Sequence, residues 1–321
     1  MLTNFLICLK AVLPIFIYLV IGMLVRRSGL LDEGSVKKLN RMVFIVMFPP
    51  LMFENLYGKD LSKAFDPKVV LYAVFGVLAA WLITWIVSGF TSLKDRPKTR
   101  GVVIQAVYRS NVVLMGIPIT MNIYGKGDLS LTAVVIAIVV PMYNVLAVVT
   151  LEYFGAAGKK ENQNAMARTV GLGILKNPLI IGAVAGLIAN FIPYKIPDFA
   201  GNIISDLGAC ATPISLLLLG ASFRLDSLKG IRKELIFCVS GRLLLVPGIL
   251  LTAAALLGFR GVAFVTLLSV FSAPAAVSSY TMAEVMGCDS VLAGNTVIFS
   301  SALASLTMFL WLFLFKSLGM F

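Results

Sequence analysis

The chain has 321 residues, of which 59% are apolar and 13% charged; its formal net charge is +12 and it holds no histidine. Because an average soluble domain carries about 25% charged residues, a chain this apolar must expose much of its surface to lipid. The lack of histidine excludes histidine-ligated metals, Ser-His-Asp triads and histidine proton relays, and basic residues placed between apolar runs argue against a nucleic-acid partner.

Ten apolar stretches follow one another, most of them about 20 residues or longer and so able to cross a hydrocarbon core of roughly 30 Å as helices. They fall near 5–25, 36–56, 68–92, 101–122, 130–154, 178–193, 201–222, 234–258, 261–285 and 289–316. The first is expected to be a retained helix, since no small-residue cleavage site precedes Arg26. The four cysteines are far apart, so no metal and no cofactor is predicted.

Positive charge sets the expected orientation in the cell's plasma (cytoplasmic) membrane. Of the 27 lysines and arginines, 17 fall in or beside loops that follow odd-numbered spans and 8 fall on the other side. Cytoplasmic loops carry the excess of Lys and Arg, so the odd loops are predicted to be cytoplasmic and both termini extracytoplasmic. Arg109 and Arg242 lie within spans.

An internal repeat divides the spans five and five. Four features recur in the same order, at offsets of 160 to 164 residues: Pro14 with Gly22 and Pro178 with Gly186; Arg100-Gly101-Val102 and Arg260-Gly261-Val262; Met121 with Asp128 and Met282 with Asp289; and a proline in spans two and seven, Pro49 and Pro213. We expect repeats at 1–154 and 178–321, joined by a cytoplasmic linker at 155–177. An odd number of spans per repeat inverts the second copy, as in secondary transporters. The predicted fold is therefore an all-α integral membrane protein with ten transmembrane helices.

Spans four and nine each carry a proline near their middle, Pro118 and Pro274. Proline removes a backbone donor and kinks or interrupts a helix, and small residues such as Gly116 beside Pro118 allow local unwinding. A single proline would be a simple kink, but a matched pair favours two broken helices. Unwound backbone at this depth must line a cavity or be buried in protein, so the two breaks indicate a substrate site, where half-helix N-termini would face an anion.

A few polar side chains inside the spans are candidates for function. Arg109 could attract a carboxylate, or it could pair with an acid such as Glu284 or Asp206 or reach to the interface. Asn111 is the stronger candidate for substrate binding, because it lies near the break and can both donate and accept hydrogen bonds. Asn144, just after Pro141 in span five, is a further candidate.

Several segments, in order along both halves, resemble the auxin efflux carrier family, which includes plant PIN proteins and bacterial organic-acid permeases. They are Asn111 to Pro118 (Asn-x-x-x-x-Gly-Ile-Pro), Leu151-Glu152-Tyr153, Lys176-Asn177-Pro178, Arg242 with Pro247, Arg260-Gly261-Val262, Ala273-Pro274 and Thr296 to Phe299. The resemblance implies two inverted five-helix repeats whose helices four and nine cross at their prolines. It also implies a scaffold of helices 1, 2, 6 and 7 and a mobile transport domain of helices 3–5 and 8–10.

The resemblance carries substrate contacts over to this chain as well. In the plant proteins two asparagines contact the substrate carboxylate, one before the first crossing proline and one beside the sixth helix. The corresponding residues here are Asn111 and Asn177. Ala275 and Ala276 stand where plant members have Gln-Gly, so a small organic acid of the malate type is a more natural substrate than auxin.

Our first hypothesis from the sequence is a secondary transporter of small mono- or dicarboxylates, with elevator-type alternating access. Asn111, Asn177 and the backbone near Gly116, Pro118 and Pro274 would hold the anion. A sodium-coupled symporter of related fold is an alternative, in which Glu284 and Asp206 are the candidate coupling residues. A transporter-like sensor without flux is another, whereas an intramembrane enzyme lacks any matching motif. The expected partners are the organic anion and the lipid bilayer, and a homodimer is compatible with the sequence.

Overall fold

The computed structural model describes residues 2–58, 65–124, 130–156, 170–192, 196–224, 228 and 230–321. These residues are helical nearly throughout, and within them no strand forms beyond one isolated bridge. Most of the predicted linker, 157–169, lies outside the described residues, as does Asp128 of the predicted repeat.

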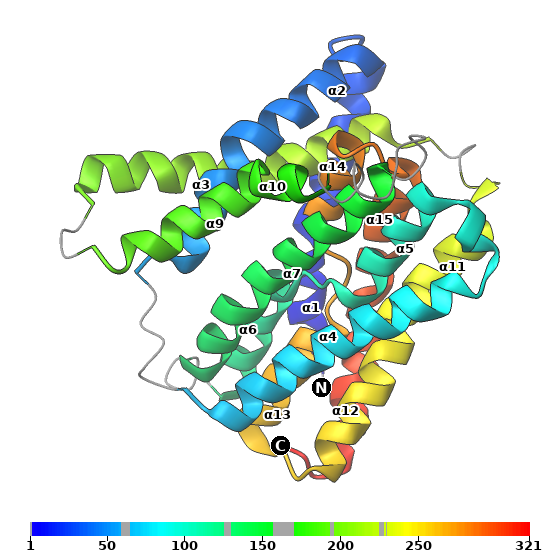
Figure 1. Cartoon of the computed structure of the whole chain (residues 1–321). Helices are drawn as coiled ribbons and strands as arrows, with labels where there is room; N and C mark the ends of the chain where they lie inside the picture. The colour runs from blue at the N-terminus through cyan, green and yellow to red at the C-terminus, as the bar shows by residue number, and fades with distance from the viewer. Residues whose placement is uncertain are drawn as a thin grey trace.

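Helices occupy all ten of the stretches predicted from the sequence (Figure 1). They are α1 (Leu2–Arg27), α2 (Glu33–Met42) with η1 (Val43–Met47) and α3 (Phe48–Leu56), α4 (Pro67–Gly89), η2 (Ser92–Asp95), α5 (Pro97–Tyr108), α6 (Val112–Tyr124), α7 (Ser130–Ala156), α9 (Pro178–Ala189), α10 (Asp198–Ser222), α11 (Arg232–Ser240) with η5 (Gly241–Leu245) and α12 (Val246–Leu256), α13 (Gly261–Ser272), α14 (Ser278–Val285) and α15 (Ser290–Ser317).

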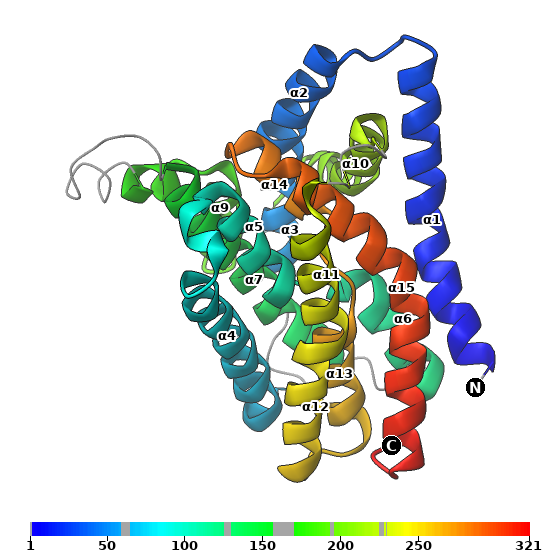
Figure 2. The same ribbon diagram turned by 90° about the vertical axis from the view of Figure 1, so that its right-hand side faces the viewer.

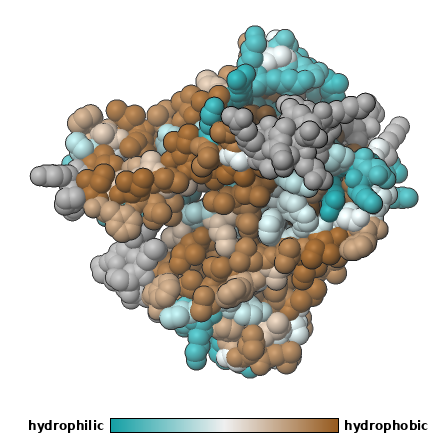
Figure 3. Space-filling view, in the orientation of Figure 1, coloured by the Kyte–Doolittle hydropathy of each residue, from teal (hydrophilic) through white to brown (hydrophobic). Residues whose placement is uncertain are grey.

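Five of the described helical stretches are long and apolar enough to cross a membrane by length and composition. They are Pro67–Gly89, Ser130–Ala156, Asp198–Ser222, Arg232–Leu256 and Ser290–Ser317; the shorter α9 and α13 are also apolar. Many large apolar side chains on these helices are exposed, Phe75 and Ile249 among them. Figure 3 shows such side chains over much of one face, with polar ones gathered near α2. The chain is an integral membrane protein.

Two of the predicted spans are interrupted. Helix α5 ends at Tyr108 and α6 begins at Val112, while α13 ends at Ser272 and α14 begins at Ser278. The second interruption contains Pro274, as the sequence predicted. The first does not contain Pro118, which lies inside α6. That part of the prediction is wrong, because a proline lacks only its own N–H and the helix continues through it, whereas the extended segment before Val112 is held by contacts with the other interrupted span.

Two short π-helical segments each precede a proline. Segment η1 ends one residue before Phe48-Pro49-Pro50, and η5 ends two residues before Pro247. A proline cannot donate to the carbonyl one turn earlier, and a π-bulge is one way in which a helix absorbs the mismatch. In η5 the bulge includes Arg242, which is fully buried.

The buried side chains form two hydrophobic clusters. One joins α4 and α6 with α12 and α13 and the inner faces of α7 and α15. The other joins α1, α2, α3, α9 and α10 and reaches the facing sides of α5, α7, α14 and α15. In Figures 1 and 2, α9 and α10 lie across one end of the molecule, while both chain termini lie at the opposite end.

Candidate anion site at the crossing of two interrupted helices

The two interrupted segments cross and hydrogen-bond to each other. Ser110 and Ala275 form an antiparallel β-bridge, and the backbone N–H of Asn111 donates to the carbonyl of Pro274 at 2.7 Å. The Ser110 hydroxyl donates to the carbonyl of Val270 at 2.9 Å. Buried backbone groups need partners, and these bonds supply some of the partners that were lost where the helices ended.

Arg242 binds the helix ends beside this crossing. Its guanidinium donates to the carbonyls of Val107 and Tyr108, at 3.1 and 2.8 Å, and to the carbonyl of Phe271. These carbonyls belong to the last turns of α5 and α13, which have no helical partner of their own. The C-terminal ends of both half-helices are therefore attached to one side chain.

Arg109 lies at the first interruption and is only 2% exposed. One terminal nitrogen donates to Oδ1 of Asn144 at 2.5 Å and to the hydroxyl of Ser278 at 2.7 Å. The other contacts the side-chain oxygen of Gln105 and the sulfur of Met282. Every one of these partners is neutral, and no salt bridge formed between described residues includes Arg109. A buried cation with only neutral partners favours the arrival of an anion.

A cavity of about 270 Å³ lies against Arg109. The first residues of α6 and α14 form part of its wall, and α1, α3, α7 and α10 form the rest. Its polar lining consists of Tyr18, Asn55, Arg109, Ser110, Asn111, Tyr143, Asn144, Thr212 and Ser278. Arg109 is the one charged residue among the described residues that line it. The other walls are largely apolar, as is usual for a small-molecule site with a few oriented polar groups.

Three of the predicted site residues meet at this cavity. Arg109, Asn111 and Asn144 all line it. Pro274 lies beside it and contributes its carbonyl to the crossing. Gly116 instead packs inside the helix bundle, where an added Cβ would lie 3.3 Å from the Cβ of Ser269. Pro118 is a half-buried residue in the middle of α6 and does not line the cavity.

The other predicted site residues lie elsewhere. Asn177 is the N-cap of α9, and its side-chain oxygen accepts a hydrogen bond of 3.0 Å from the N–H of Leu179. Asp206 is exposed on α10. Glu284 lines a separate cavity of about 440 Å³ at the end of the molecule where α2 begins. Neither acid lines the crossing cavity, and the described residues include no cluster of three potential metal ligands.

Several polar residues of the cavity were not among the predicted site residues, Ser278 and Tyr143 among them. Neither residue was singled out as a candidate from the sequence. Ser278 binds Arg109, and the Tyr143 hydroxyl lies 3.2 Å from the Ser110 hydroxyl. No local motif marks either residue, because their roles depend on partners 169 and 33 positions away.

A comparison with protein families gives a match that covers nearly the whole chain. The family described as "Membrane transport protein" matches residues 7–312. The chain belongs to this family. The match confirms, at the level of the family, the resemblance to auxin efflux carriers found in the sequence. Members of this membrane transport family are transporters and not enzymes, so the protein is a transporter by family and the enzyme reading is excluded.

Three curated relatives align along almost their full length. A protein of Methanothermobacter thermautotrophicus named "Uncharacterized transporter" is 25% identical over 94% of this chain and 96% of its own. Another named "Uncharacterized transporter", from Methanocaldococcus jannaschii, is 23% identical over 94% of this chain and 97% of its own. A Rhizobium meliloti protein with the printed name "Putative malonate transporter" is 23% identical over 95% of both chains. All three are named as transporters.

Proposed function

We propose that this member of the membrane transport family is a secondary transporter of small organic anions, and that the anion binds where the two interrupted helices cross. The main support is Arg109, a buried guanidinium that lines a cavity with only neutral side chains around it. A cation at membrane depth is costly unless it is paired or hydrated. A carboxylate is the partner that would pair with its two terminal nitrogens. The printed name of the Rhizobium relative refers to malonate, which is a small organic anion.

The half-helix N-termini add to this attraction. Residues Asn111 to Val113 at the start of α6, and Ala276 to Ser278 at the start of α14, line the same cavity. The first N–H groups of a helix lack helical partners and carry the positive end of its dipole, and anions bind there readily. The opposite, C-terminal ends of α5 and α13 contact Arg242 instead. Positive potential is thus directed toward the cavity.

Ten crossings in two inverted repeats are the proposed architecture, and one pair of glycines supports it. Gly22 of α1 packs against α10, where an added Cβ would lie 2.0 Å from the carbonyl oxygen of Leu217. Gly186 of α9, its match in the sequence repeat, packs against α3, with 2.5 Å from such a Cβ to the carbonyl oxygen of Phe53. Span one therefore contacts span seven as closely as span six contacts span two, which is the relation that an inverted duplication would produce.

For the mechanism we propose elevator-type movement of spans 3–5 and 8–10 against a scaffold of spans 1, 2, 6 and 7. A buried polar network crosses between the two groups and supports this division. Tyr280 of α14 hydrogen-bonds with Asn40 of α2 and Ser222 of α10, at 3.1 and 2.5 Å. Thr281 bonds with Asn40 and with Ser215, each at 3.2 Å. Single hydrogen bonds contribute about 0.5–1.5 kcal/mol each, so such an interface can be exchanged for another.

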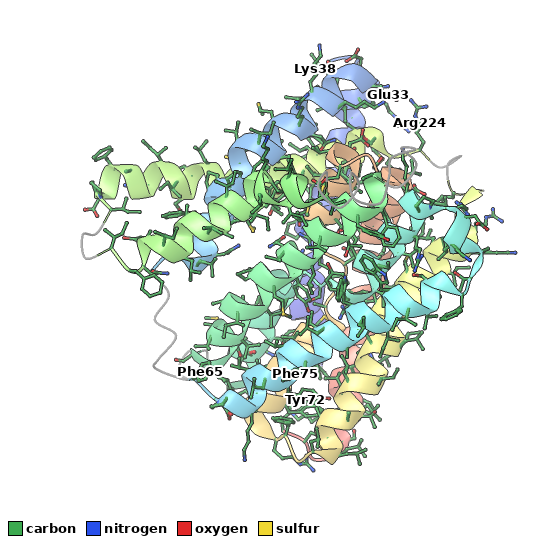
Figure 4. All side chains as sticks on the ribbon, in the orientation of Figure 1. Glu33, Lys38, Phe65, Tyr72, Phe75 and Arg224 are labelled. Carbon is green, nitrogen blue, oxygen red and sulfur yellow. The ribbon has the colours of Figure 1, made fainter. Side chains whose placement is uncertain are left out.

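The charged end of the molecule is the proposed cytoplasmic end, with both termini outside. Glu33, Lys38 and Arg224 gather there in Figure 4, and Phe65, Tyr72 and Phe75 lie toward the other end. Glu33 pairs with Lys37 at 3.2 Å and with Arg224 at 3.6 Å. The hydrogen bond from Lys37 is the main cause that lowers the pKa of Glu33. Lys and Arg are enriched on the cytoplasmic side of membrane proteins, which supports the proposed orientation.

Uptake by proteoliposomes tests the proposed function. Purified protein is first screened by thermal shift against mono- and dicarboxylates, malonate included, with and without sodium, because a ligand that binds the folded state raises the melting temperature. Stabilising acids are then tested as radiolabelled substrates. We expect Arg109→Gln to abolish both stabilisation and uptake, and Arg260→Gln, at an exposed arginine, to retain both. Uptake by Arg109→Gln at the wild-type rate would reject the site, and binding without flux would indicate a sensor.

A further inference from the structure

Arg242 occupies an unusual position for a cation. It is 0% exposed, it lies in the middle of a predicted span, and no salt bridge among the described residues includes it. The hydrogen bonds found for it go to backbone carbonyls: those of Val107 and Tyr108 at the end of α5, and that of Phe271 at the end of α13. The two helix ends come from segments more than 160 residues apart in the chain.

The chemistry of the guanidinium suits this arrangement. The last carbonyls of a helix lack donors and carry the negative end of the dipole. At membrane depth no water is available to satisfy them. Arginine offers five donors in a planar fork and stays charged, so one side chain can serve carbonyls of two helices at once. The two helix dipoles, in turn, offset part of the cost of burying its charge.

The local backbone conformation places Arg242 beside the C-terminal ends of α5 and α13. The residue lies in the π-helical segment η5, just before Pro247. Next to it, Gly241 packs against α5, where an added Cβ would lie 3.0 Å from a methyl carbon of Val107. Such bulges often occur at functional sites. The close approach of η5 to α5 places the guanidinium against the ends of the interrupted helices rather than toward lipid.

We propose that Arg242 is a positioning residue for carboxylate binding, an inference that rests on the proposed function. It compensates the negative ends of α5 and α13, so that Arg109 and the N-termini of α6 and α14 determine the potential in the cavity. It also fixes where Arg109 lies, since the carbonyl of Tyr108 that Arg242 binds belongs to the peptide bond preceding Arg109. Arg242 itself does not line the cavity. It acts through groups that do.

A matched set of variants separates this role from a merely structural one. Arg242→Gln removes the charge, Arg242→Lys keeps it with fewer donors, and Arg100→Gln is the control. Arg100 also donates to a carbonyl near a helix end, that of Trp85 in α4, at 2.8 Å, but it does not line the crossing cavity. For each variant we would measure the melting temperature without ligand, and KM and the maximal rate of carboxylate uptake per folded protein.

We expect KM to rise roughly tenfold in Arg242→Gln and about threefold in Arg242→Lys, because a cation beside the C-terminal ends of helices interacts favourably with their dipoles and lysine keeps that charge with fewer donors. Arg100→Gln should lower the melting temperature and leave KM unchanged. An unchanged KM in folded Arg242→Gln would overturn the proposal. If that variant does not fold, the Lys variant decides, and its KM must rise. Wild-type protein that moves no carboxylate would instead reject the proposed function, whatever the Arg242 variants do.

Discussion

Arg109 donates a 2.5 Å hydrogen bond to Oδ1 of Asn144, which joins the first interrupted span to α7. Both residues are nearly fully buried and both line the crossing cavity. The amide orients the guanidinium without neutralising it, since an amide oxygen carries no formal charge. The site therefore keeps its positive charge available to a ligand.

This relationship predicts the effect of Asn144→Asp. A carboxylate at this position would form a buried ion pair with Arg109 and occupy the charge that a substrate needs. We expect carboxylate affinity to fall at least about tenfold, since a buried pair is worth several kcal/mol to break, with an unchanged or higher melting temperature. Isothermal titration with the best carboxylate from the thermal-shift screen measures this. Asn144→Leu is the uncharged control and should weaken binding less. Wild-type affinity in Asn144→Asp would contradict Arg109 as the anion's partner.

A second prediction concerns the side chain of Asn111. Its backbone N–H holds the crossing by donating to Pro274, and its side chain lines the cavity. Asn111→Ala keeps the backbone bond, so the melting temperature should change little. The loss of one hydrogen bond to a charged ligand should weaken binding by about 1.5–3 kcal/mol. Normal uptake by the folded variant would show that Asn111 does not contact the substrate.

A third prediction tests the close packing of the matched glycines. Gly22→Ala and Gly186→Ala each place a methyl group against the backbone of a neighbouring helix. Overpacking of this kind typically costs about 1–3 kcal/mol, so both variants should melt at lower temperature by similar amounts. Gly201→Ala on α10 is the control, because no atom lies within 4 Å of an added Cβ there. Equal melting temperatures in all three would argue against close contact between these spans.

A fourth prediction concerns the polar network between the two groups of helices. Tyr280→Phe removes the hydroxyl that bonds with Asn40 and Ser222. The described arrangement of the two groups of helices should lose roughly 1–3 kcal/mol of stability relative to other arrangements. The distribution of distances between spin labels at Lys38 and Val291 should therefore broaden or shift. Tyr72→Phe is the control, because its hydroxyl bonds with Leu250 within one group of helices. An unchanged distance distribution in Tyr280→Phe would mean that the network does not hold the two groups.

The sequence by itself determined the helical stretches, the family and the correspondence between spans four and nine, each with a proline near its middle. Apolar runs of about 20 residues are a local property of the chain, and such a property is present in any arrangement of the helices. The same reasoning located Arg109, Asn111 and Asn144 as costly polar groups inside apolar stretches. Burial of polar side chains in lipid is expensive wherever the helices lie, so those residues were candidates before any contact was known.

Only the tertiary structure decided where the first span breaks and which groups meet there. Helix α6 continues through Pro118. The first span breaks earlier, at Ser110 and Asn111, where the crossing segment supplies backbone partners. Asn177 caps α9, and the substrate contact that the family resemblance implied for it stays a prediction. The partners of Arg242 lie 29 to 135 positions away along the chain. Hydrogen bonds between distant segments depend on how whole helices pack, and no local pattern of residues records that packing.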